Sequence, residues 1–227
     1  YYFESLIVKM IVGRKGDSTI PNFPPLSVIK KLEFDLPSLK EQEKIGYLLK
    51  DLDAKIELNN KINSELESIA KLIYDYWFVQ CDFPDENGKP YKSSGGKMVY
   101  SEELKREIPE GWEVKEIQEL AFCIMGQSPK GKSYNQDGIG TPLLNGPADY
   151  ENGGLKANTF TTEPTRLCKT DDMVLCIRAT IGNLVYSEKE FCLGRGVAAV
   201  RPLSSELSEY VYYLLEREIE VFKVRAT

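Results

Sequence analysis

The chain has 227 residues, of which 28 % are charged and 42 % hydrophobic, with a formal net charge of −6 and no histidine. This composition is ordinary for a folded protein of one large domain or two modest ones. The absence of histidine excludes Ser-His and Cys-His nucleophile pairs and the usual histidine-containing zinc sites. The acidic balance disfavours a non-specific nucleic-acid binder but allows a local basic face.

No apolar run approaches the ~20 residues of a membrane span, and no signal peptide is visible. The five cysteines are scattered and include no CxxC pair. We therefore expect a cytoplasmic protein with reduced thiols, no metal site and no membrane partner.

The first 36 residues read as an apolar segment (1–10), a loop rich in Gly and Pro (13–25) and a strand-like piece (26–36). The opening letters YYFE are echoed by YYLLE at residues 212–216. We interpret residues 1–36 as the tail of a repeat unit whose body is not repeated here.

A heptad pattern occupies residues 41–78, which contain no proline and one glycine. With Ile45 as the first core position, eight of ten core positions are apolar or aromatic. This spacing predicts a coiled-coil helix of roughly 57 Å, at ~1.5 Å per residue, and a long core helix is the alternative. Ser38 and Glu41 fit a capping box that starts the helix. The seam comprises Ile45, Leu48, Leu52, Lys55, Asn59, Ile62, Leu66, Ile69, Ile73 and Tyr76, in which the two polar residues would set register.

The remainder of the chain divides into a linker and a lobe. Residues 81–108 are polar and turn-rich, and form a linker or hairpin. In the lobe, residues 173–177, 183–186 and 197–201 are predicted strands, and a final helix opens at Ser204 or Ser205. The predicted fold class is α+β, a β-rich domain joined to a long coiled-coil helix. The expected divisions are 1–36, 37–80, 81–108 and 109–227.

Three stretches, in this order, resemble the specificity subunit of type I restriction–modification systems. The first, STIPNF followed by LEFDLPSLKEQEKIGYLLKDLDAKIELNNKINSELESIAKLIYDYWFVQCDF, resembles the family's spacer helix and its lead-in. The second, IPEGWEVKEIQEL, resembles the start of a target-recognition domain. The third, with GQSPKGKSYN, GTPLLNGPADY and the segment from TTEPTRLCK to GRGVAAVRP, resembles the body of such a domain.

The resemblance implies a subunit that reads DNA and has no catalysis or cofactor of its own. Intact members of that family carry two recognition domains and two long antiparallel helices, and each domain reads half of a bipartite site. This chain has one long helix and one complete-looking recognition domain, so it is a half-length subunit, a truncation or a fragment. A half-length subunit would pair its helix with that of a second copy.

The resemblance also implies the partners. These are double-stranded DNA, an adenine methyltransferase subunit and, where the system has one, a motor-nuclease subunit. The methyltransferase is expected to bind the helix near the aromatic run at Tyr76, Trp77 and Phe78. Packing of that run onto the chain's own lobe is the alternative.

The residue types suited to DNA contact gather in residues 126–135, GQSPKGKSYN, and around two arginines near strand ends. Lysines suit phosphates, Gln and Asn suit adenine, and Arg reaches a guanine edge or a phosphate. The candidates are Gln127, Ser128, Lys130, Lys132, Ser133, Tyr134, Asn135, Asn145, Lys156, Arg178, Thr180 and Arg195.

Other interpretations compete with DNA contact at these positions. The loop could be a solvated turn, Tyr134 a core residue, and each arginine a structural partner of Asp171, Asp172 or Glu190. GQSPKGKS resembles a nucleotide-binding loop only superficially. No adenine methyltransferase signature is present, and the carboxylates of residues 84–89 lie in a turn-rich linker where nuclease chemistry is not expected. For the chain as a whole, a coiled-coil protein-interaction scaffold is the alternative function.

Overall fold

The computed structural model describes residues 27, 30–31, 36–151, 153–178 and 182–225. The chain divides into two compact units, Tyr1–Ser64 and Glu65–Thr227. The loop, the strand-like piece and the repeat tail predicted for residues 1–36 fall almost entirely outside the described residues. Within the described residues, no helix is long and apolar enough to cross a membrane.

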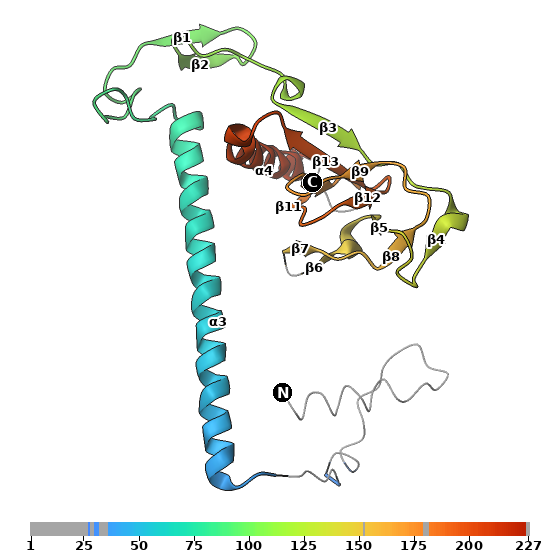
Figure 1. Ribbon diagram of the computed structural model, residues 1–227. Coiled ribbons are helices and arrows are strands. Elements are labelled where there is room, and N and C mark those ends of the chain that lie inside the picture. The colour runs from blue at the N-terminus through green and yellow to red at the C-terminus, as the bar shows by residue number, and fades with distance from the viewer. Residues whose placement is uncertain (1–26, 28–29, 32–35, 152, 179–181, 226–227) are drawn as a thin grey trace. The chain divides into compact units, whose positions relative to one another are not determined.

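Helix α3, Leu39–Tyr74, confirms the long helix expected over residues 41–78 (Figure 1). Ser38 donates from its backbone nitrogen and its hydroxyl to the Glu41 carboxylate at 3.0 and 2.6 Å, so the Glu41 half of the predicted capping box forms, while the Glu41 backbone nitrogen donates to the Ser38 carbonyl at 2.9 Å. These hydrogen bonds lower the pKa of Glu41. The chain continues as a π-helical turn, Asp75–Val79, and leaves the helical path at Cys81, whose φ is 65°.

The segment after the helix is held by local contacts. Residues 81–96 form turns with a bridge between Pro84 and Pro90. Strands β1 (Met98–Ser101) and β2 (Arg106–Pro109) then pair as an antiparallel hairpin. Phe83 stacks between Tyr91 and Trp112, with ring centroids 4.8 and 5.3 Å away, so the segment is packed onto the start of the following lobe.

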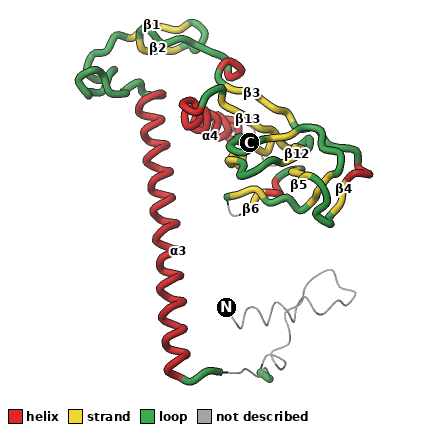
Figure 2. Tube along the Cα trace, in the orientation of Figure 1, coloured by secondary structure: helices red, strands yellow, loops and turns green. Residues whose placement is uncertain are grey.

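Two larger sheets build the lobe (Figure 2). The first is antiparallel, in the order β11 (Gly182–Tyr186), β10 (Met173–Cys176), β13 (Val197–Pro202), β3 (Ala121–Met125). The second is mixed, in the order β4 (Tyr134–Asn135), β8 (Thr159–Thr161), β5 (Thr141–Leu144), β12 (Phe191–Leu193), β9 (Leu167–Cys168). Strands β6 (Tyr150–Glu151) and β7 (Gly154–Leu155) form a small hairpin. The three predicted strands are confirmed as β10, β11 and β13.

The central strands of the antiparallel sheet, β10 and β13, are buried on both faces, and alternate residues of each strand point to opposite sides. Along β13, Val197 and Ala199 join the core shared with the mixed sheet, whereas Val200 joins the core beneath helix α4 (Ser208–Arg225). Helix α4 follows a short 3-10 turn, Ser205–Leu207, as expected from the serines. The lobe thus has three layers: mixed sheet, antiparallel sheet and helix (Figure 1).

Candidate nucleic-acid interface

Several strand ends of the lobe meet at one place. Strand β12 runs parallel to β5, so both end together, and the Gly194 backbone nitrogen donates to the Leu144 carbonyl at 2.7 Å. Strand β3 ends beside the start of β13, where the Gly126 nitrogen donates to the Val197 carbonyl at 3.0 Å. Residues 194–196 therefore connect the two sheets, because β12 belongs to one sheet and β13 to the other.

The connection is a Gly-Arg-Gly turn with both glycines buried and Arg195 exposed. A Cβ on Gly194 would lie 2.7 Å from Asn145 Oδ1 and 2.8 Å from the Leu144 carbonyl oxygen. A Cβ on Gly196 would collide with the Asn145 carbonyl oxygen. Close backbone approach therefore requires glycine on both sides of the arginine.

Ser128 is the polar partner of this arginine. The Ser128 hydroxyl accepts from the Arg195 backbone nitrogen at 3.4 Å and from Nε at 3.3 Å. Among the described residues, Arg195 forms no ion pair with a carboxylate. Its guanidinium charge is thus exposed and uncompensated, which is the state expected of a group available to an anionic or hydrogen-bonding ligand.

Other predicted residues lie at the same strand ends. Gln127 donates its backbone nitrogen to the Leu193 carbonyl at 2.8 Å. Arg178 is exposed and follows Ile177, whose nitrogen donates to the Gly196 carbonyl at 2.9 Å. We call the set Gln127, Ser128, Asn145, Arg178 and Arg195 the strand-end surface. Thr180, a further candidate, lies outside the described residues.

The rest of loop 126–135 is organised differently. Ser133 is buried and its hydroxyl lies 2.8 Å from that of Thr161. The Asn135 amide donates to the Ile139 carbonyl at 2.9 Å and accepts from the Ile139 nitrogen at 3.0 Å, so the group suited to adenine is engaged in closing a turn. Tyr134 is half-buried, while Lys130 and Lys132 are exposed.

The stretch GQSPKGKS has the GxxxxGK[ST] spacing of a phosphate-binding loop. The structural context is nevertheless wrong. Such a loop opens a helix, whereas Gly131–Ser133 is a single 3-10 turn that leads into strand β4. Pro129 has no backbone donor. The fold therefore disfavours nucleotide binding, although the spacing fits.

Two polar residues next to the strand-end surface are not among the residues predicted from the sequence. Thr165 donates its hydroxyl to the Gln127 carbonyl oxygen. Arg166 is exposed, and its carbonyl accepts from the Leu193 nitrogen at 2.8 Å. The pairing of β9 with β12 brings them there. That pairing joins residues more than twenty positions apart, and no local pattern in the sequence predicts it.

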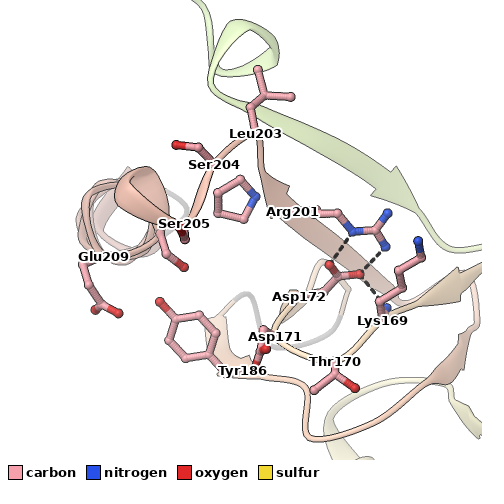
Figure 3. A pocket seen from close by; sticks show the side chains of 12 residues that line it. Lys169, Thr170, Asp171, Asp172, Tyr186, Arg201, Leu203, Ser204, Ser205 and Glu209 are labelled. Carbon is pink, nitrogen blue, oxygen red and sulfur yellow. Dashed lines mark hydrogen bonds and ion pairs between the residues drawn. The ribbon is translucent and has the colours of Figure 1, made fainter.

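A different arginine takes the structural role considered for Arg178 and Arg195. Asp172 is buried and accepts from Arg201 Nε and Nη2, each at 2.7 Å (Figure 3). The Asp172 carboxylate also accepts from the Lys169 backbone nitrogen at 2.7 Å. The hydrogen bonds to Asp172 raise the pKa of Arg201. With Asp172 engaged by Arg201, this carboxylate does not neutralise the strand-end surface.

Lys156, also a candidate, pairs with Glu151 at 2.5 Å on the β6–β7 hairpin. In the linker, Asp85 accepts from the backbone nitrogens of Asn87 and Lys89 at 2.8 and 2.9 Å. The Asp85 carboxylate therefore closes a turn. Among the described residues, no group of three or more acidic or cysteine side chains is placed to hold a metal ion.

The aromatic run at the end of the helix divides by exposure. Phe78 packs edge-on against Tyr210 with centroids 4.8 Å apart, and Tyr74 is buried beside Tyr210 and Tyr213. Tyr76 and Trp77 remain exposed. The alternative of packing onto the chain's own lobe thus holds for Phe78, while the neighbouring two side chains stay accessible.

The predicted seam of α3 faces solvent. Its seven aliphatic side chains are between 42 % and 62 % exposed, and Lys55 and Asn59 are exposed as well. The exposed aliphatic residues are Ile45, Leu48, Leu52, Ile62, Leu66, Ile69 and Ile73.

The class of protein follows from comparison with known families. Residues 1–68 and 109–226 match the family described as the type I restriction modification DNA specificity domain. The matched residues are most of the chain, which therefore belongs to this family. The family resemblance inferred from the sequence is confirmed.

Two relatives named as type I restriction enzyme specificity subunits are similar to this chain in sequence. A Methanocaldococcus jannaschii protein, provisionally named the type I restriction enzyme MjaX specificity subunit, is 32 % identical over 218 residues, covering 95 % of this chain and 48 % of the relative. The HindI specificity subunit of Haemophilus influenzae is 22 % identical, covering 89 % and 56 %. The chain thus spans about half the length of these relatives. The crystal structure of the HsdS subunit from Thermoanaerobacter tengcongensis aligns with a TM-score of 0.46 at 24 % identity, covering 95 % of this chain and 51 % of that one.

Proposed function

We propose that this chain reads one half of a bipartite DNA target as part of a type I restriction–modification complex, and that it has no catalytic activity of its own. Its family and the names of its relatives support the assignment. The strand-end surface is the structural observation that supports a DNA-binding site. There Arg178 and Arg195 are exposed and form no ion pairs among the described residues. Exposed arginines and amides suit phosphates and base edges.

Residues 109–227 would be the recognition domain and residues 37–80 the spacer helix. We infer that the aliphatic seam of α3 pairs with the helix of a second copy, because a solvent-exposed stripe of this spacing is stabilised by a partner helix. The helix would then set the distance between two half-sites. Residues 1–36 would be the tail of a recognition-type repeat, and residues 81–108 the linker.

The proposed partners are an adenine methyltransferase subunit, which would do the chemistry, and a motor-nuclease subunit where the system has one. Exposed Tyr76 and Trp77 support a docking position at the end of the helix. The complex would act in the cytoplasm, on double-stranded DNA. The scaffold alternative is less favoured, since the family match covers the lobe as well as the helix.

The decisive experiment is selection of duplexes from a randomised library by the chain, alone and with a methyltransferase subunit of its own system. We expect enrichment of a defined sequence, binding that weakens steeply with salt, and methylation of a defined adenine by the complex. Equal binding to all duplexes, together with methylation at no defined adenine, would contradict the proposal and favour the scaffold.

A further inference from the structure

We propose that Arg195 reads a guanine through its two terminal nitrogens and that Ser128 is a positioning residue that aims it. This inference rests on the proposed function and assigns one base contact within it. Both residues were expected to touch DNA, but the geometry separates their roles: one would contact the base, and the other would orient the first.

The backbone of Arg195 is held rigidly. Its two glycine neighbours are buried against Leu144 and Asn145, and the strands on either side of the turn lie in the core. The Val197 nitrogen donates to the Gly194 carbonyl at 3.1 Å, which closes the turn. A side chain on a fixed backbone loses less conformational freedom when it binds, and this favours selective recognition.

The guanidinium is also oriented. A guanidinium has five N–H donors, one on Nε and four on the two terminal nitrogens. The Ser128 hydroxyl accepts from Nε at 3.3 Å and from the Arg195 backbone nitrogen at 3.4 Å, so it engages the base of the fork. Among the described residues, no other hydrogen bond or ion pair engages the Arg195 side chain. The four terminal donors are left to a ligand.

The two terminal nitrogens of the guanidinium present parallel N–H donors, which match the O6 and N7 acceptors of guanine in the major groove. Adenine presents an amino donor where guanine has O6, so the same fork would be repelled. A phosphate contact needs the positive charge but not this orientation. The presence of an orienting hydroxyl therefore favours a base edge over the backbone.

The test begins with the duplex that the wild-type chain selects from a random library. Each guanine is replaced in turn by adenine or by 7-deazaguanine, which lacks the N7 acceptor, and affinities are measured by fluorescence anisotropy. We expect one guanine whose replacement by adenine costs the wild type about tenfold to a hundredfold. In Arg195→Gln the preference for guanine over adenine should vanish or reverse, because Gln suits adenine, while preferences at the other positions remain.

The matched control is Lys189→Gln, which removes the same charge near the opposite end of β12, where Lys189 is exposed. It should keep the guanine preference. Ser128→Ala should reduce the preference at the same guanine only, and Ser128→Thr should restore it. Thermal unfolding of each variant separates lost recognition from lost folding.

Two results would overturn the inference while leaving the proposed function intact. One is an Arg195→Gln variant that binds all duplexes more weakly by the same factor, which would indicate a phosphate contact. The other is a variant that keeps every base preference of the wild type. A wild-type chain without any sequence preference would instead overturn the proposed function, and this inference with it.

Discussion

Asp172, in the turn just before β10, faces Arg201 on β13, with Nε–Oδ1 and Nη2–Oδ2 distances of 2.7 Å. The side chains are 2 % and 31 % exposed, so the carboxylate is buried and the guanidinium borders solvent. The pair joins the turn before β10 to β13, at the end of these strands away from the Gly-Arg-Gly turn.

Removing the cation should leave a buried carboxylate without its ion-pair partner. We expect Arg201→Met to lower the free energy of unfolding by about 3 kcal/mol. Lys169→Met is the matched control, because it removes an exposed cation while its backbone nitrogen still donates to Asp172. The control should change stability by less than about 0.5 kcal/mol in urea unfolding. Equal losses in the two variants would contradict the structural role of the pair.

Two glycines of the same loop should respond differently to an added methyl group. A Cβ on Gly126 would collide with the carbonyl oxygens of Gly194 and Val197, whereas a Cβ on Gly131 would meet nothing within 4 Å. We expect Gly126→Ala to lower the free energy of unfolding by about 2 kcal/mol or more, since the neighbours are backbone atoms that cannot turn away. Gly131→Ala should be close to neutral. Thermal unfolding of the two variants measures the difference, and similar melting temperatures would refute it.

High pH should destabilise the lobe. Tyr212 stacks on Tyr186 with centroids 5.1 Å apart, and burial raises the pKa of Tyr212 to about 12. A raised folded-state pKa gives stability that is fully present below the unfolded value of about 10 and is lost as the pH rises through about 12. Stability should therefore fall over this window, and less steeply in Tyr212→Phe.

The control for this prediction is Tyr100→Phe, because Tyr100 is exposed on the β1–β2 hairpin. Its stability should depend on pH as in the wild type. Urea midpoints measured across the window decide the matter. Identical pH dependence in Tyr212→Phe and Tyr100→Phe would show that the half-buried Tyr212 hydroxyl does not contribute.

Pairing of the helix seam between two copies should double the molar mass measured in solution. Light scattering of the parent chain should give about twice the chain mass, and the double variant Lys55→Glu with Leu66→Asp should reduce it to one chain by placing charge in the seam. The matched control places Tyr47→Asp with Lys50→Glu on the same helix, outside the seam, and should stay paired. A parent chain that is monomeric at micromolar concentration would rule out self-pairing.

The elements with strong local signals were predictable. The capping-box residues Ser38 and Glu41 and the heptad spacing predicted α3. Strands β10, β11 and β13 were predicted because they are apolar runs between turns. The short strands of the mixed sheet were missed. Strand β5 contains Pro142, and β4 and β9 have two residues each, so their pairing depends on neighbours distant in sequence.

The candidate site was predictable only in part. The residue types alone predicted five residues that the sheet pairings bring together at one set of strand ends: Gln127, Ser128, Asn145, Arg178 and Arg195. The same reasoning named Ser133 and Asn135, whose polar groups are engaged by Thr161 and Ile139. It missed Thr165 and Arg166. Which of these residues touch DNA stays a prediction.

The sequence by itself determined the family, the long helix and the α+β composition, because these depend on spacing and order along the chain. Only the tertiary structure decided which arginine is structural and which is free. Arg201 and Arg195 are six residues apart, yet one meets a buried carboxylate and the other projects from a glycine turn with a serine as its partner. Strand pairing sets that difference, because it determines which side chains from distant segments become neighbours.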